Sequence, residues 1–137
     1  MAAYSPTVND KTAFDDAMMA VRADHATLRT LALAVTKNPG FSTDDALSLM
    51  SAMESHERSE GRLFALPFMD PPPASVTSTA ARAQRRAAEF NSGTPQLPDP
   101  KAAAALFVDA LLTHLAVEDA WLAQEGQQLE ERLRTAH

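Results

Sequence analysis

Apolar residues recur along this chain at the three- and four-residue spacing of an α-helix, in four separate stretches. A stripe of this kind is typical of a helix that buries one face against other helices. Runs with the strict alternation of a half-buried β-strand are few. The pattern therefore predicts an all-α fold, an antiparallel up-down-up-down four-helix bundle, in a single domain covering residues 1–137.

Local signals indicate where the predicted helices begin and end. A capping-box pattern starts at Thr12, and Ser42 is placed to cap the second helix, which Pro67 ends. Asp99 stands directly before a proline, which is the usual order at a helix start. The predicted elements are an N-terminal arm at residues 1–11 and helices at about residues 12–37, 43–66, 75–91 and 99–134.

Two polar residues interrupt the apolar stripe of the second predicted helix. His56 and Glu60 are four residues apart, so they lie on one face, about one turn from each other. Leu49, Met53 and Leu63 surround them on that face. Burying an imidazole and a carboxylate without partners is costly. A metal ion is the leading explanation for polar side chains at this place.

The same arrangement recurs in the fourth predicted helix, where His114 and Glu118 have matching apolar neighbours. His25 falls on the inward stripe of the first helix. Three imidazoles and two carboxylates without a thiolate suit iron, manganese or zinc. Carboxylates can bridge two ions, so one or two ions are compatible with the set. The predicted metal ligands are His25, His56, Glu60, His114 and Glu118.

Simpler explanations and other metal motifs account less well for these residues. A lone His–Glu pair at this spacing is usually a solvent-exposed ion pair, but the repeat and the third histidine favour metal binding. A zinc-protease H-E-x-x-H motif starting at His56 fails because its fifth residue is Glu60. Ferritin-like sites need a glutamate three residues before each histidine, and this chain has Arg22, Met53 and Leu111 there.

Composition narrows the function classes further. The net charge of −6 gives no electrostatic footprint for nucleic-acid binding. The chain has no cysteine, which excludes disulfides and thiolate metal sites. No uninterrupted run of about 18 apolar residues indicates a membrane span, and the N-terminus lacks the pattern of a secretion signal. A cytoplasmic location without nucleic-acid or membrane partners is therefore expected.

Taken in order, these residues resemble the hemerythrin-like, or HHE cation-binding, family, over most of the chain. The motifs that carry the resemblance are Asp24-His25, His56-x-x-x-Glu60 followed by Leu63-Phe64, and His114-x-x-x-Glu118. Proteins of that family are four-helix bundles with a non-haem di-iron centre. They bind or sense dioxygen, or take part in iron handling and in responses to oxidative or nitrosative stress.

The resemblance implies a role for each predicted ligand. His25 and His56 would hold one ion, and His114 would hold the other. Glu60 and Glu118 would bridge the two ions.

The third predicted helix departs from the family pattern because it has no histidine. The positions expected to face inward are alanines: Ala80, Ala83 and Ala87. Gln84 or Glu89 would replace the missing ligand only if the helix were rotated differently. A second ion is therefore expected to be weaker, rich in water ligands or absent. Asp119 is a lesser candidate ligand, since some family members place the carboxylate one residue later.

These observations favour a binding or sensing protein over an enzyme, and no catalytic residue is predicted. The expected cofactor is non-haem iron, as one or two ions, with manganese or zinc as alternatives. The expected partners are the metal ion and dioxygen or another small diatomic molecule, and a homodimer is compatible with the fold. Two alternatives stay open: a di-iron enzyme that reduces peroxide or nitric oxide, and a metal-free helical interaction module.

Overall fold

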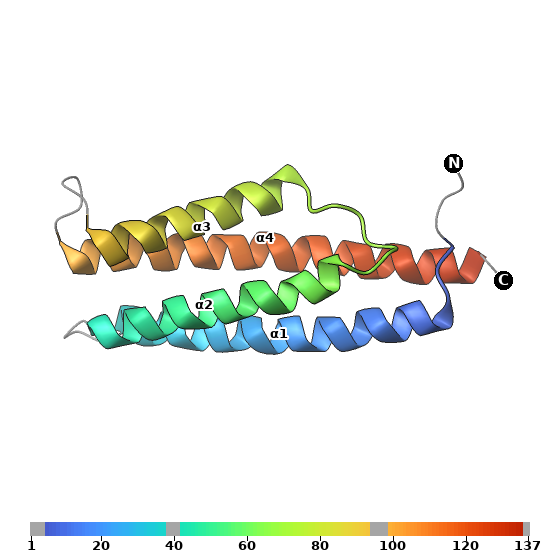
Figure 1. Cartoon of the computed structure of the whole chain (residues 1–137), viewed down its shortest axis with the longest axis horizontal. Helices are drawn as coiled ribbons and strands as arrows, with labels where there is room; N and C mark the ends of the chain where they lie inside the picture. The colour runs from blue at the N-terminus through green and yellow to red at the C-terminus, as the bar shows by residue number, and fades with distance from the viewer. Residues whose placement is uncertain (1–4, 38–41, 94–98, 136–137) are drawn as a thin grey trace.

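The computed structural model describes residues 5–37, 42–93 and 99–135, which form four α-helices and no strand. The helices lie alongside one another (Figure 1). They are α1 (Val8–Lys37), α2 (Thr43–Phe64), α3 (Ala74–Ser92) and α4 (Pro100–Thr135). Helix α1 packs against α2 and α4, and α3 packs against α4, whereas α2 and α3 meet only sparingly. The prediction of an all-α fold is confirmed.

Helix α1 begins one turn earlier than the sequence analysis predicted. The Thr7 hydroxyl accepts the backbone N–H of Asp10 at 3.2 Å, and the Asp10 carboxylate accepts the N–H of Thr7 at 2.8 Å. This reciprocal pair is a capping box. The predicted start at Thr12 is therefore wrong, and residues 8–11 of the predicted arm are helical, whereas residues 1–4 lie outside the described residues. Both threonines begin a Thr-x-x-Asp pattern, and the upstream one prevails because the added turn gains backbone hydrogen bonds.

The other helix ends lie close to their predicted positions. Ser42 caps α2 by accepting the N–H of Asp45 at 3.2 Å. Asp99 caps α4 by accepting the N–H of Lys101 at 3.0 Å. Helix α2 ends slightly before residue 66, and α3 ends against Gly93, whose φ of 73° is in the left-handed region that favours glycine.

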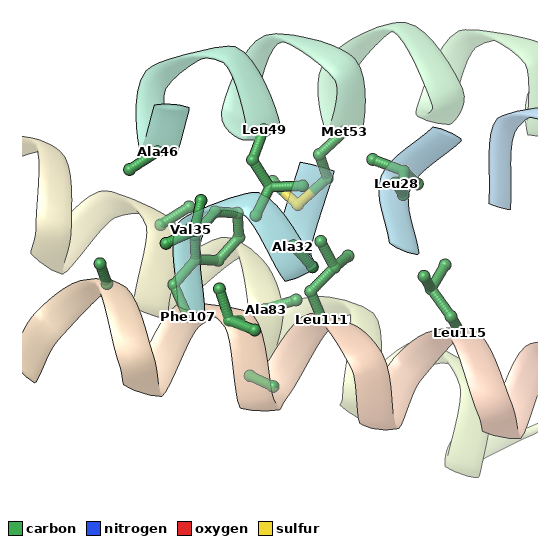
Figure 2. Packing of buried hydrophobic residues seen from close by; sticks show 14 residues of the cluster. Leu28, Ala32, Val35, Ala46, Leu49, Met53, Ala83, Phe107, Leu111 and Leu115 are labelled. Carbon is green, nitrogen blue, oxygen red and sulfur yellow. The ribbon is translucent and has the colours of Figure 1, made fainter. Parts of the chain in front are cut away.

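The buried apolar residues form two clusters, one toward each end of the helices. The larger contains Leu28, Leu49 and Phe107, and Figure 2 shows it from close by. The smaller contains Phe14 and Leu122. Along α1, α2 and α4, the residues between the two clusters are the polar ones described below. The fold thus places a polar layer between two dry apolar regions.

Helix α4 is long and apolar enough, by length and composition alone, to cross a membrane. Its best 18-residue window has a mean hydropathy of 1.4. By this measure the chain does contain a segment long and apolar enough to span a membrane, contrary to the expectation from the sequence. In the structure 44% of that window is buried, and α4 carries the buried ionisable residues His114, Glu118 and Glu125. The core helix of a soluble protein passes the same test, so this property is weak evidence for a membrane span.

Candidate metal centre

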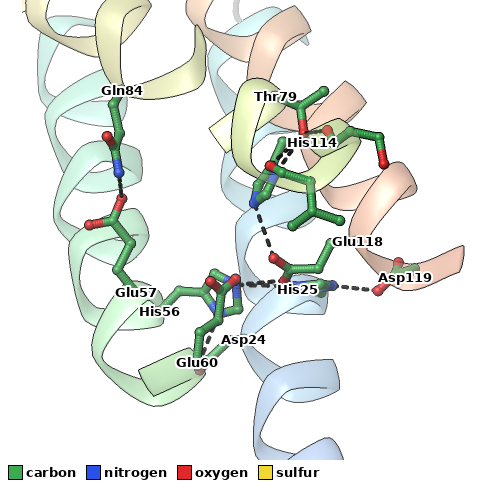
Figure 3. Close-up of polar contacts among 12 residues, drawn as sticks. Asp24, His25, His56, Glu57, Glu60, Thr79, Gln84, His114, Glu118 and Asp119 are labelled. Atoms are coloured by element: carbon green, nitrogen blue, oxygen red, sulfur yellow. Dashed lines mark hydrogen bonds and ion pairs between the residues drawn. The ribbon is translucent and has the colours of Figure 1, made fainter. Parts of the chain in front are cut away.

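All five predicted ligands are buried in the polar layer. Figure 3 shows their side chains and the polar contacts among them. They come from α1, α2 and α4, and their exposed fractions run from 0% to 9%: His25, His56, Glu60, His114 and Glu118. Ionisable side chains are rarely buried to this degree unless they are paired or coordinate a metal. The paired histidine and glutamate positions therefore face inward, as the apolar frame around them predicted.

Four of these residues bring ligand atoms together at one point. One ligand atom from each of His25, His56, Glu60 and Glu118 lies within 4.8 Å of the other three. The Nε2 atom of His25 is 3.1 Å from Nε2 of His56 and 2.9 Å from Oε1 of Glu118. The Nε2 atom of His56 also contacts Oε1 of Glu60 directly. This group could hold a metal ion.

The spacing and chemistry of the group fit a transition-metal ion. Donor atoms that each lie about 2.1 Å from one ion are about 3.0–3.4 Å apart in octahedral or tetrahedral geometry. The separations among His25, His56 and Glu118 are 2.9, 3.1 and 3.4 Å. Two imidazoles and two carboxylates form a borderline donor set that suits iron, manganese or zinc.

Hydrogen bonds on the outer side of the rings orient both histidines. His25 Nδ1–H donates to Asp119 at 2.6 Å, and Asp119 also pairs with Arg29. His56 Nδ1–H makes a longer hydrogen bond, 3.4 Å, to Asp24. With the proton on Nδ1, the lone pair of each Nε2 points into the cluster. A carboxylate behind a histidine is the usual outer support of a metal-binding imidazole.

Protons and a metal ion would compete for the same atoms in this cluster. Burial alone would lower the pKa of His56, but contacts with Glu118 and Glu60 raise it to about 10. Burial raises the pKa of Glu60 to about 7, against the opposing effect of His56. Burial would also raise the pKa of Glu118, but contacts with three histidines lower it instead. The cluster is therefore a strong binder of positive charge.

Two buried carboxylate oxygens in the cluster make no hydrogen bond. They are Oε1 of Glu60 and Oε2 of Glu118, although each lies against an imidazole nitrogen. Buried polar atoms in folded proteins nearly always have a hydrogen-bond partner, so two such oxygens at one place need an explanation. Coordination of a cation in the group of four would satisfy the Glu60 oxygen, whereas the Glu118 oxygen faces Nε2 of His114 at 3.2 Å.

His114 lies outside the group of four. Its Nε2 atom is 3.2 Å from Oε2 of Glu118, on the other side of that carboxylate from His25. Its Nδ1–H donates to the Thr79 hydroxyl at 2.9 Å, and Thr79 in turn donates to the carbonyl oxygen of Ser75. The structure therefore connects His114 to the centre only through Glu118.

Helix α3 supplies no ligand among the residues that the structure describes. Ala83 is buried at the place where a ligand would project inward. Gln84 is exposed and donates to Glu57 at 2.8 Å, and Glu89 pairs with Arg86 at 3.0 Å. A cavity of about 70 Å³ lies beside His114, with Ala80, Ala83, His56 and Glu60 among its lining residues.

Sequence reasoning missed the residues that support the ligands from outside. Asp24 was noted only as the residue before His25, and Thr79 was not identified, because a carboxylate or hydroxyl behind a ring leaves no mark in helical periodicity. Asp119 was considered as a ligand, but it contacts Nδ1 of His25 and not the Nε2 atom that faces the cluster. Arg29 lies one turn after His25 on the same face of α1. Its position was the sequence feature that indicated a charged partner, such as Asp119, beside His25.

Comparison of the chain with protein-family models, with curated proteins and with solved structures found no match. The function is therefore inferred from the geometry of the centre.

Proposed function

We propose that this protein is hemerythrin-like and binds a non-haem metal ion, with iron as the first candidate and manganese or zinc as alternatives. Its role would be to bind or sense dioxygen or another small diatomic molecule, or to handle iron. The observation that carries the proposal is the convergence of His25, His56, Glu60 and Glu118 within 4.8 Å.

The proposal includes an antiparallel up-down-up-down arrangement of the four helices. It is supported by Figure 1, in which the colour gradient reverses its direction from each helix to the next. The ligands come from α1, α2 and α4, in that order along the chain. The proposed resemblance to hemerythrin-like proteins rests on this order and on the spacing of each His–Glu pair.

Each residue of the centre has a distinct task in this proposal. His25 and His56 bind through Nε2, and Asp119 and Asp24 hold their rings in the binding orientation. Glu60 and Glu118 neutralise the charge of a divalent cation, and the apolar clusters on both sides exclude water. A bound iron ion would supply a redox couple and a coordination position for a small ligand.

We propose one firmly held ion, because the four-residue group is complete and His114 has only Glu118 as a neighbouring ligand. A di-iron enzyme would need a second ion of similar affinity. A metal-free interaction module would keep the polar layer only to fix the register of the helices.

The test is metal analysis of freshly purified wild-type protein and of two alanine variants. We expect about one ion per chain in the wild type, none in His56→Ala and still one in His114→Ala. The difference between the two variants arises because His56 belongs to the group of four and His114 does not.

Other outcomes would contradict the proposal. Two tightly held ions per chain, with both lost in His114→Ala, would favour the di-iron enzyme. A wild-type protein that never binds metal, together with a His56→Ala variant of higher stability, would favour the interaction module.

A further inference from the structure

The candidate centre lies next to a weakly packed side of the molecule. Helix α1 packs closely against both α2 and α4, and α3 against α4, but α2 and α3 make few contacts with each other. The cavity of about 70 Å³ lies between these two helices, where Met53 from α2 and Ala83 from α3 are among its walls. This side therefore offers space that reaches the ligands.

An outer groove lies next to this cavity on the surface. The groove has a volume of about 280 Å³ and is lined by residues of α2 and α3. It shares Met53, Glu57 and Gln84 with the inner cavity. The groove and the inner cavity therefore have these three side chains as a common wall.

One hydrogen bond spans the junction between groove and cavity. Gln84 Nε2–H of α3 donates to Oε1 of Glu57 on α2 at 2.8 Å, as Figure 3 shows. Both residues are exposed. A single hydrogen bond between exposed groups contributes little net stability, about 1 kcal/mol. Side chains held this weakly can move apart without disturbing the helices.

The charges along this path favour a cation. Glu54 and Glu57 line the outer groove, and neither groove nor cavity is lined by a lysine or arginine. At the inner end the cavity reaches Glu60, which at 9% is the most exposed of the four grouped ligands. Acidic groups in a groove raise the local concentration of cations and repel anions.

The other two partly exposed carboxylates near the centre do not offer such a path. Asp24 and Asp119 contact the outer Nδ1 atoms of the histidines, so they stand behind the rings. They also lie where α1 packs closely against α2 and against α4.

We propose that a divalent metal cation enters and leaves the centre between α2 and α3, drawn in by Glu54 and Glu57 and gated by the Gln84–Glu57 hydrogen bond. This inference rests on the proposed metal-binding function and adds the path by which the centre is loaded.

The gate is tested by the kinetics of Co²⁺ binding to metal-stripped protein, with release measured after addition of excess chelator. In Gln84→Ala the gate is absent, so association and dissociation should both accelerate, by about three- to tenfold, with the dissociation constant unchanged within about twofold. Gln124→Ala removes an exposed glutamine of α4 and serves as the matched control.

The acidic groove is tested separately with Glu54→Gln, which leaves the gate intact. Association should slow by about threefold at low ionic strength, and the difference should fade as salt is added. Asp109→Asn makes the same change of charge on the exposed side of α4 and should have no such effect.

Identical rates in Gln84→Ala and Gln124→Ala would overturn the gate, and identical rates in Glu54→Gln and Asp109→Asn would overturn the groove. If the wild type binds Co²⁺ with rates that none of these variants changes, the path is wrong and the metal-binding function stands. If the wild type binds no metal ion, both proposals fall.

Discussion

Each of the three buried histidines has one ring nitrogen fixed by an oxygen outside the cluster. Asp119 holds His25, Asp24 holds His56, and the Thr79 hydroxyl holds the third imidazole. The ring orientations are therefore set by the protein before any ion binds, which lowers the cost of ordering the ligands on binding. The shortest of the three contacts, 2.6 Å, belongs to Asp119.

Replacing Asp119 by alanine should weaken metal binding by about ten- to a hundredfold, the usual cost of losing such a partner. His25 could then rotate or place its proton on Nε2, which would remove the lone pair from the cluster. Chelator competition gives the affinity. Asp24→Ala is the comparison and should cost less, because its hydrogen bond to His56 is longer, at 3.4 Å. Unchanged affinity in Asp119→Ala would contradict the assigned role.

Helix α4 runs without a break through Gly126, and the neighbouring helix explains why a glycine stands there. A Cβ atom at Gly126 would lie 3.3 Å from the ring edge of Phe14 on α1, which is tighter than an ordinary contact. Phe14 is itself buried and packs against Phe68. Glycine thus lets α1 and α4 approach closely at this end, at some cost in helix propensity.

Two glycine-to-alanine substitutions should therefore have different effects on stability. Gly61 on α2 has nothing within 4 Å of an added Cβ, so Gly61→Ala should stabilise the protein by about 0.5–1 kcal/mol. Gly126→Ala should increase the stability less or not at all, because the Phe14 ring must shift to make room for the added Cβ atom. Thermal unfolding of both variants at one pH compares them directly. A larger gain from Gly126→Ala would show that the Phe14 ring moves freely.

At the scale of the whole molecule, the centre joins two pairs of helices. The pair α1 and α2 supplies His25, His56 and Glu60, and the pair α3 and α4 supplies Glu118. The stability of the molecule should therefore depend on what the centre binds. An ion present at a thousand times its dissociation constant adds about 4 kcal/mol to the free energy of unfolding.

The metal-stripped protein should become less stable as the pH rises. The pKa of His56 is raised from 6.5 to about 10. Its contribution to the free energy of unfolding is therefore complete below pH 6.5 and is lost by about pH 10. The pKa of Glu60 is raised from 4.5 to about 7, so its contribution to the free energy of unfolding also falls as the pH rises between those values. Glu118 has a lowered pKa, so its contribution is lost only in acid.

Melting temperatures between pH 6 and pH 10, with and without bound metal, test this expectation. The melting temperature of the stripped protein should fall by several degrees, whereas the loaded protein should resist the change because the ion takes the place of the protons. His56→Ala should remove most of the decline. Equal slopes for stripped protein and His56→Ala would contradict the raised pKa.

Much of this architecture was readable in the sequence, because helical periodicity reports which face of a helix is buried. It predicted four helices and placed both His–Glu pairs inward. It placed the first cap at Thr12 and missed the one at Thr7, which starts the same local pattern. Nor could it find Asp24 behind His56, because that contact depends on how two helices are rotated against each other.

The division of the ligands between two helix pairs has a mechanical consequence. The ligand atoms of His25, His56 and Glu118 are at most 3.4 Å apart, so a small movement of one helix pair away from the other would separate them. A bound ion would then cross-link the two pairs, so loading the centre should also restrict their motion relative to each other.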